Sequence, residues 1–368
     1  MTVASVSGVP RVRDVSTEPA IRIQNLWKVF GPKPHRIVDD TELADMTRAQ
    51  LRSRFGCTAA VRDVSFEVLP GEVFVIMGLS GSGKSTLIRC LTRLIEPTAG
   101  KVLYRDQDVL GLDKDQLREL RRNEFSMVFQ HFGLLPHKTV LENVSYGLKI
   151  RGEDQNCRES RAREVIELVG LSGYESSHPA QLSGGMQQRV GLGRALAGDP
   201  EVLLFDEPFS ALDPLIRRDM QSEVARLHRE VGKTIVFITH DLDEALKLGD
   251  RIALMQDGEL VQVGTGADLV GAPATDYVRD FVRDVSREKV LPVSWIMKPT
   301  DERQFSRTVA EDTLICDAIG PLLAADGAVG VTDGERLTGY LDVRDVLSLL
   351  QENAALHLNT TSKVDPQP

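Results

Sequence analysis

Three things are scarce in this chain of 368 residues: long apolar runs, cysteine and excess positive charge. No segment approaches the roughly 18 consecutive apolar residues of a membrane-spanning helix, and residues 1–20 lack the apolar centre of a signal peptide. Cys57, Cys90, Cys157 and Cys316 have neither metal-ligand nor disulfide-framework spacing, which indicates reduced thiols in a cytosolic protein. The formal net charge of −10 argues against nucleic acid as the main partner, because phosphate backbones select basic surfaces.

Strand-like segments alternate with helix-like segments through most of the chain. The expected strands are residues 21–30, 61–68, 71–78, 201–206 and 234–239. The expected helices are residues 85–95, most of 113–197, and 217–232, with a charged, helix-prone insert at 39–56. Strands that alternate with helices predict a parallel sheet with crossover helices, so the fold class is α/β.

The character of the sequence changes after about residue 275. From there it reads as helix, strand, a tight turn at Asp333-Gly334, strand and helix, which predicts a small separate α+β module. The expected domains are a disordered leader at 1–20, a nucleotide-binding domain at 21–275 with a helical subdomain at about 131–197, a module at 276–353, and a disordered tail at 354–368.

The segment "GLSGSGKST" fits the phosphate-loop pattern G-x-x-x-x-G-K-[ST]. It follows an apolar strand and opens a helix, which is the context that supports nucleotide binding. Lys84 is expected to reach the β- and γ-phosphates, Ser85 to bind Mg²⁺ and Thr86 to contact the α-phosphate. The whole nucleotide-binding loop comprises Gly78, Leu79, Ser80, Gly81, Ser82, Gly83, Lys84, Ser85 and Thr86.

Four further polar residues follow apolar segments. Asp206, at a strand end, can hold Mg²⁺ through water, and Glu207 can act as general base toward the attacking water. His240, after the next strand, is a candidate γ-phosphate contact, and Gln130 is a candidate ligand of Mg²⁺ or water. The alternatives are an acidic end that only caps the next segment, a structural histidine and a solvated glutamine.

A second anion-binding loop, "LSGG", precedes a helix that is expected to begin near Met186. A second such loop would be redundant on the same nucleotide, so we expect it to face the nucleotide of another copy. Two chains arranged head to tail would sandwich two ATP molecules. Each γ-phosphate would then lie between Lys84 of one chain and Ser183 and Gly185 of the other.

The segments "GLSGSGKST", "VFQ", "LSGGMQQR", "LLFDEP", "SALD" and "ITH", in this order, resemble an ABC transporter ATPase over residues 21 to about 265. The resemblance implies a P-loop NTPase fold with a RecA-like core and a helical subdomain. It also implies an aromatic residue that stacks on adenine, for which Phe30 fits best, although tyrosine is commoner there. Beyond the phosphate loop, it carries functional roles over to Gln130, Ser183, Gly184, Gly185, Gln187, Asp206, Glu207, Asp213 and His240.

The insert between Phe30 and Val61, together with "RLIEPTAGKV" and "MVFQHFGLLPHKTVLENVSYGL", resembles the ATPase subunit of glycine betaine/proline (quaternary amine) importers. Such subunits usually carry a pair of CBS repeats, whereas the tail here fits one CBS-like repeat, at about 309–351. The resemblance implies ATP and Mg²⁺ as cofactors and uptake of a compatible solute such as glycine betaine, choline, carnitine or proline. The alternative is another small polar solute, with a tail that is only structural.

The resemblance implies a homodimer beneath two membrane permease subunits, peripheral on the cytoplasmic face of the inner membrane, and an extracytoplasmic substrate-binding protein. Permease docking is expected beside "HFGLLPH", where Phe132, Leu134, Leu135 and Pro136 either line a groove or belong to the core of the helical subdomain. A DNA-repair or ribosome-acting ABC protein would need a long coiled-coil insertion or two cassettes, and the sequence has neither. The tail either senses ionic strength or a nucleotide, or serves as a passive dimerisation domain.

Overall fold

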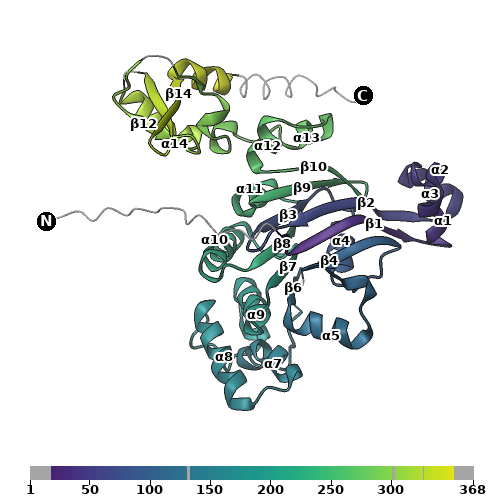
Figure 1. Ribbon diagram of the computed structural model, residues 1–368. Coiled ribbons are helices and arrows are strands. Elements are labelled where there is room, and N and C mark those ends of the chain that lie inside the picture. Colours follow the sequence, from purple (N-terminus) through teal and green to yellow (C-terminus); the bar gives the residue numbers. More distant parts are fainter. Residues whose placement is uncertain (1–17, 131–132, 301–302, 326, 352–368) are drawn as a thin grey trace, which may run out of the picture.

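Figure 1 shows the computed structural model of the chain, which describes residues 18–130, 133–300, 303–325 and 327–351. The leader expected at 1–20 lies outside these residues except for its last three positions, and the tail expected at 354–368 lies wholly outside them. In the part of the chain that is described, no helix is both long and apolar enough to cross a membrane.

The centre of the molecule is a six-stranded sheet with the order β10-β9-β3-β8-β7-β6. All strands are parallel except β10, which pairs antiparallel with β9. The strands are β3 (Val73–Met77), β6 (Phe125–Phe129), β7 (Val202–Asp206), β8 (Thr234–Thr239), β9 (Arg251–Gln256) and β10 (Glu259–Gly264). β3, β7 and β8 are buried along their whole length, as continuous apolar runs in a sheet covered on both faces should be. The parallel α/β core expected from the sequence is confirmed.

Helices follow the central strands of this sheet. α4 (Lys84–Leu91) follows β3, α10 (Pro214–Val231) follows β7, and α11 (Leu242–Leu248) follows β8. The helix expected at 85–95 is shorter than predicted, because Arg93 adopts a left-handed backbone conformation with φ of 55°. Helical geometry therefore ends at Leu91, four residues before the expected end.

The segment 113–197 is largely helical, as expected, but it also contains β6. Its helices are α5 (Lys114–Asn123), α6 (Val140–Val144), α7 (Tyr146–Arg151), α8 (Gln155–Leu168), η2 (Pro179–Gln181) and α9 (Gly184–Ala197). The short apolar run "FSMVF" is a strand because it pairs in parallel with β7. Such a run cannot be distinguished from a buried helical turn by its periodicity alone. α9 begins at Gly184, two residues before the expected position.

A second sheet, antiparallel with the order β2-β1-β4-β5, packs beside the first. Its strands are β1 (Ile21–Phe30), β2 (Thr58–Val68), β4 (Ala99–Tyr104) and β5 (Gln107–Asp108), with η1 (Val109–Gly111) after β5. The rings of Phe66 and Phe74, one from each sheet, are stacked with centroids 4.8 Å apart. This contact ties the two sheets into one apolar core.

The insert, residues 31–57, joins β1 to β2. It folds into α1 (Pro34–Asp39), α2 (Thr41–Ala44) and α3 (Arg48–Phe55). Ile37, Leu43 and Leu51 are buried against the ends of the two strands and form a small core of their own. The helix-prone insert expected from the sequence is therefore an ordered extension of the antiparallel sheet.

The chain after β10 forms α12 (Gly266–Gly271), α13 (Asp276–Phe281), η3 (Arg287–Lys289) and η4 (Val293–Trp295), followed by a third sheet. That sheet has the order β11-β14-β13-β12, and α14 (Ile315–Leu323) packs on it. Its strands are β11 (Lys298–Pro299), β12 (Thr308–Ala310), β13 (Ala328–Asp333) and β14 (Arg336–Asp342), and residues 343–351 are helical. Figure 1 shows this sheet at the opposite end of the molecule from α7 and α8.

Candidate functional site

The carboxyl ends of four parallel strands meet at one edge of the central sheet. The register pairs Met77 with Thr239 and pairs Asp206 with both Ile238 and Phe129. The segments that leave these strands, from Gly78, Gln130, Glu207 and His240, therefore start side by side. Ligands of open α/β sheets bind at this edge.

A cavity of about 340 Å³ opens there, and we call it the Lys84 cavity. Its lining includes the predicted residues Ser80, Gly81, Gly83, Lys84, Ser85, Thr86, Gln130 and Glu207. It also includes Arg48, Thr58 and Ala60, which the sequence reasoning missed. Thr58 and Ala60 carry no motif, and Arg48 was visible only as one of several basic residues in the insert.

The phosphate loop lies between β3 and α4, as predicted. A Cβ atom at Gly83 would lie 2.0 Å from the Ala60 carbonyl oxygen, and one at Gly78 would lie 2.2 Å from that of Met255. Both glycines also have positive φ, of 114° and 150°. Only glycine fits at these two positions, which explains the pattern in physical terms.

Lys84 is 4% exposed at the base of the cavity. Its Nζ donates hydrogen bonds to the carbonyl oxygens of Gly78 (2.8 Å) and Leu79 (3.1 Å) and lies 3.5 Å from Glu207 Oε1. A buried ammonium group held in this way is a fixed positive charge in the cavity.

Glu207 is the first residue after β7 and has φ of 48°, a left-handed conformation that is uncommon for a residue with a side chain. Its backbone N–H donates to the Ile238 carbonyl oxygen at 3.1 Å. Its Oε2 lies 3.1 Å from His240 Nδ1. Backbone strain of this kind concentrates at functional sites, because it aims a side chain that a relaxed strand would not. His240, whose side chain is 52% exposed, reaches the cavity through this contact.

Asp206 is buried beside the cavity. Its Oδ1 accepts a hydrogen bond from Ser85 Oγ at 2.6 Å, and its Oδ2 accepts one from Arg89 Nη2 at 3.1 Å. A hydroxyl and a carboxylate oxygen in contact, with the Gln130 amide on the same cavity, form the all-oxygen donor set that suits Mg²⁺. Among the described residues there is no cluster of three or more His, Cys, Asp or Glu side chains with metal-ligand geometry. A single carboxylate with a hydroxyl fits a Mg²⁺ that is also held by phosphate oxygens.

The second loop, for which the sequence predicts anion binding, lies away from this cavity. Ser183 caps α9, with its Oγ accepting from the Met186 N–H at 3.3 Å. A Cβ at Gly185 would lie 2.5 Å from Ile216 Cγ2, so this glycine permits close packing on α10. Gln187 Nε2 donates to the carbonyl oxygens of Pro179 and Leu182. None of residues 183–187 lines the Lys84 cavity, so a single chain does not bring the two loops together.

Other predicted site residues also lie outside the lining, namely Phe30, Gly78, Leu79, Ser82, Asp206, Asp213 and His240. Asp213 caps α10, with its Oδ1 accepting from the N–H groups of Leu215 and Ile216 at 3.1 Å each. Phe30 is 43% exposed and pairs across the sheet with Thr58, which does line the cavity. Lys28 Nζ lies 4.9 Å from the Phe30 ring centroid.

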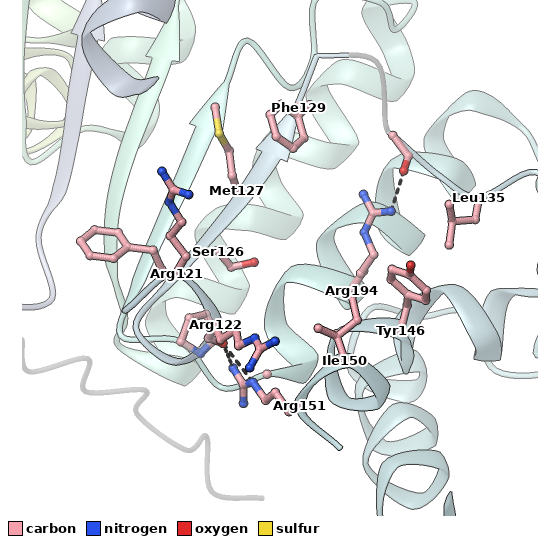
Figure 2. A pocket seen from close by; sticks show the side chains of 15 residues that line it. Arg121, Arg122, Ser126, Met127, Phe129, Leu135, Tyr146, Ile150, Arg151 and Arg194 are labelled. Carbon is pink, nitrogen blue, oxygen red and sulfur yellow. Dashed lines mark hydrogen bonds between the residues drawn. The ribbon is translucent and has the colours of Figure 1, made fainter. Parts of the chain in front are cut away.

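Figure 2 shows a second hollow, which lies between β6 and the helical segment and which we call the subdomain groove. Phe129, Tyr146 and Ile150 form part of its apolar lining. Arg194 Nη1 donates to the Gly133 carbonyl oxygen at 2.6 Å, and Arg151 Nε donates to that of Arg122 at 2.9 Å.

Two apolar residues of "HFGLLPH" occupy the two expected environments, one in each. Leu135 lines the subdomain groove, Leu134 packs against the core, and Pro136 is exposed. Phe132 lies outside the described residues.

Comparisons with known proteins agree with this geometry. Residues 61–210 match the family described as ABC transporter. The chain is 54% identical to the glycine betaine transport ATP-binding protein OpuAA of Bacillus subtilis, over 76% of this chain and 66% of that protein. It is 46% identical to the trimethylamine N-oxide transport system ATP-binding protein TmoW of Pelagibacter ubique, over 86% of this chain and 93% of that protein.

A solved structure shares both sequence and fold. The dimeric, post-hydrolysis structure of the ATP-binding cassette MJ0796 bound to ADP and Pi is 32% identical, with a TM-score of 0.56. The match covers 67% of this chain and 98% of that one. The phosphate loop, the strand-end carboxylates and these relatives agree: the chain belongs to the ABC transporter family and is one of its ATP-binding proteins.

Proposed function

We propose that this chain hydrolyses ATP to drive the uptake of a small methylated-amine osmolyte, of the glycine betaine type, through a membrane permease. The observation that carries the proposal is the 54% identity with the glycine betaine transport ATP-binding protein of Bacillus subtilis. Proteins named for glycine betaine/carnitine and for glycine betaine/proline betaine transport are 50% and 48% identical.

A second candidate solute is trimethylamine N-oxide. The alignments with the two proteins named for its transport cover 93% and 97% of their lengths, whereas 66% of the Bacillus protein is covered. Betaines and trimethylamine N-oxide are both zwitterions that carry a methylated cationic nitrogen and a negatively charged oxygen. The ATPase does not contact the solute, so its own residues do not choose between them.

Hydrolysis is assigned to the residues around the Lys84 cavity. Lys84 and the backbone N–H groups of the loop bind the phosphates. Ser85, Asp206 and Gln130 would hold Mg²⁺, which would offset negative charge on the β- and γ-phosphates. Glu207 accepts a proton from the water that attacks the γ-phosphorus, the bond to the β-phosphate oxygen breaks, and ADP and phosphate result. His240 orients the Glu207 carboxylate and contacts the γ-phosphate.

The assembly is proposed to be a head-to-tail homodimer. The support is the position of Ser183, Gly184, Gly185 and Gln187 outside the Lys84 cavity of their own chain, and the dimeric state named for the MJ0796 structure. In such a pair the α9 end of one chain completes the nucleotide site of the other. Asp213, at the neighbouring start of α10, lies at the same interface, and Phe30 stacks on adenine.

The remaining partners are proposed from the same family relationship. Two permease subunits dock on the homodimer, one in the subdomain groove of each chain. Phe129 and Ile150 in this groove are 38% and 50% exposed. An extracytoplasmic binding protein delivers the solute. The ATPase is then peripheral on the cytoplasmic face of the inner membrane. Residues 21–275 form the ATPase domain, with its helical subdomain at about 131–197, and residues 276–353 form a CBS-like module.

An uptake panel tests the proposed function. A strain that lacks this gene, complemented with wild type, is expected to accumulate radiolabelled glycine betaine, carnitine, proline betaine or trimethylamine N-oxide, and the preferred solute identifies the class. Complementation with a chain carrying Glu207→Gln is the matched control and should give background uptake. Equal uptake by both strains for every solute would overturn the proposal.

A further inference from the structure

The insert places one guanidinium group against the phosphate loop. Arg48, the first residue of α3, donates from Nη1 to the Gly81 carbonyl oxygen at 2.6 Å and from Nη2 to that of Ser82 at 3.2 Å. It also donates to β2, from Nε to the Ala59 carbonyl oxygen (2.8 Å) and from Nη2 to that of Ala60 (3.1 Å). One side chain therefore ties together the insert, β2 and the phosphate loop.

This arrangement suits arginine in particular. The guanidinium group presents five N–H donors in one rigid plane, and here they reach four carbonyl oxygens on two separate segments. The side chain is 20% exposed, and burial lowers the pKa of Arg48. Asp257 Oδ1, in the β9–β10 turn, lies 3.8 Å from Nη1 and partly offsets the charge.

Two of the four carbonyl groups that Arg48 holds, those of Gly81 and Ser82, belong to the phosphate loop. A phosphate loop turns its N–H groups toward the anion, so its carbonyl groups need donors on the other side. The Ser82 carbonyl oxygen has a second donor, the Gly258 N–H at 2.9 Å. Gly81 and Ser82 are thus held by a residue of α3 and by the β9–β10 turn.

The position of Arg48 is itself fixed. Thr47 and Gln50 form a capping box at the start of α3: the Gln50 N–H donates to Thr47 Oγ1, and the Thr47 N–H donates to Gln50 Oε1 at 2.9 Å. Leu51, one turn along, is fully buried in the small core of the insert. The guanidinium therefore comes from a rigid element, as a positioning residue requires.

We propose that Arg48 is a positioning residue of the ATP site, which preorganises residues 81–83 so that their N–H groups face the phosphates. Its positive charge lies on the lining of the same cavity as Lys84 and adds to the attraction for the polyphosphate. The insert is then a functional part of the nucleotide site. This inference rests on nucleotide binding by the loop and is independent of the transported solute.

The test measures MgATP affinity and turnover separately for Arg48→Ala and Arg48→Lys. We expect the Kd for MgATP of R48A to rise at least about tenfold, the factor that corresponds to about 1.4 kcal/mol. R48K keeps the charge without the planar fork, and its Kd should lie between those of R48A and wild type. Turnover at saturating MgATP should fall by less than about threefold in both variants. The loop geometry is expected to affect the binding of MgATP and not the hydrolysis step that follows it.

Arg52→Gln is the matched control, because Arg52 is exposed on the same helix. Its Kd should stay within about twofold of wild type, a difference of about 0.4 kcal/mol. A thermal unfolding series with and without MgATP separates positioning from folding, since a purely structural role lowers both midpoints equally and leaves the MgATP-induced shift intact.

Either of two results would overturn the proposal: a wild-type MgATP-induced shift in R48A, or a Kd for R48K equal to that of wild type together with lost turnover. Should R48A not fold, R48K alone carries the test. Failure of the uptake panel would leave these binding results unaffected, so the two proposals can fail independently.

Discussion

At the scale of single residues, Glu207 combines three observations. Its backbone is left-handed, its carboxylate lies 3.5 Å from Lys84 and 3.1 Å from His240, and it lines the Lys84 cavity. The contacts with an ammonium group and an imidazole restrict the conformational freedom of the Glu207 side chain and fix the direction of its carboxylate. This geometry supports the role of general base that the sequence predicts.

Glu207→Gln is expected to leave MgATP binding within about threefold of wild type and to lower ATP hydrolysis at least about 100-fold, since the amide cannot accept the proton from water. Single-turnover hydrolysis and equilibrium binding measure the two quantities. Under non-hydrolysing conditions the variant should accumulate as a MgATP-bound dimer. Glu201→Gln is the control, because Glu201 is an exposed glutamate immediately before the first residue of β7, whereas Glu207 follows its last residue. Wild-type turnover in E207Q would remove Glu207 from the role of base.

At the scale of secondary-structure elements, a buried carboxyl group joins three of them behind the site. Glu244 on α11 accepts a hydrogen bond from Thr239 Oγ1 of β8 at 2.6 Å and from Gln221 Nε2 of α10 at 3.1 Å. Arg217 Nε lies 4.0 Å away, and Arg217 Nη2 also donates to the Leu212 carbonyl oxygen. The cluster therefore connects the segment before Asp213 with the segment that carries His240.

Burial raises the pKa of Glu244 above its ordinary value of 4.5. The folded state then holds this proton more tightly than the unfolded chain, so its contribution to stability falls as pH rises from about 4.5 through the raised value. Glu244→Gln removes the titration. The difference in free energy of unfolding, variant minus wild type, should therefore shift in the variant's favour between about pH 5 and about pH 8.

Urea denaturation at the two pH values measures this difference. Asp243→Asn, on the exposed side of the same helix, serves as control and should show no comparable change. A Glu244→Gln difference that is identical at both pH values would contradict the expectation.

The predictability of the fold varied with the kind of element. The predicted bounds of β8 and β1 match the structure at every residue. Both are runs of strand-favouring residues between polar segments, and such runs have few other structural interpretations. β6 was missed because five residues inside a helical stretch carry too little periodicity, and only pairing with β7 makes them a strand. Gln130 owes its place beside the cavity to that strand.

The site divides in the same way. The residues of the phosphate loop could be predicted because close backbone approach and phosphate chemistry dictate both residue type and spacing. The contacts of Arg48 could not be predicted, because they depend on how α3 packs beside β2. In the sequence, Arg48 precedes the loop residues whose carbonyl groups it holds by more than 30 positions. The functional roles of all the predicted site residues, from Lys84 and Glu207 to Gln130, Asp213 and Ser183, stay predictions.

At the scale of the whole molecule, the third sheet is joined to the ATPase core through apolar contacts. The Trp295 ring packs so closely on Gly271 of α12 that a Cβ there would lie 2.4 Å from Cζ3. Leu291 and Val293 are buried in the same cluster as Leu269 and Val270. The lining of the Lys84 cavity, in contrast, runs only from Arg48 to Glu207.

Deleting residues 285–368 is therefore expected to lower the thermal unfolding midpoint by about 2 °C or more, because α12 loses its apolar cover. The MgATP Kd should stay within about threefold of that of wild type. A shorter deletion, residues 300–368, keeps Trp295 on α12 and should recover most of the midpoint. Differential scanning calorimetry and equilibrium binding measure both.

Transport assays of the shorter deletion across a salt series then address the module itself. An unchanged salt response would reject sensing of ionic strength and favour a passive role. A tenfold loss of MgATP affinity in either deletion would contradict the independence of the cavity from the third sheet.

The separation between the α9 terminus and the Lys84 cavity has a consequence for stoichiometry. In the proposed homodimer, each chain contributes its α9 terminus and its Lys84 cavity. The two-fold symmetry pairs each α9 terminus with the cavity of the other chain, so all four surfaces are occupied. Nothing is left over to recruit a third copy, so the assembly is self-limiting and does not grow into filaments, however abundant the protein becomes in the cell.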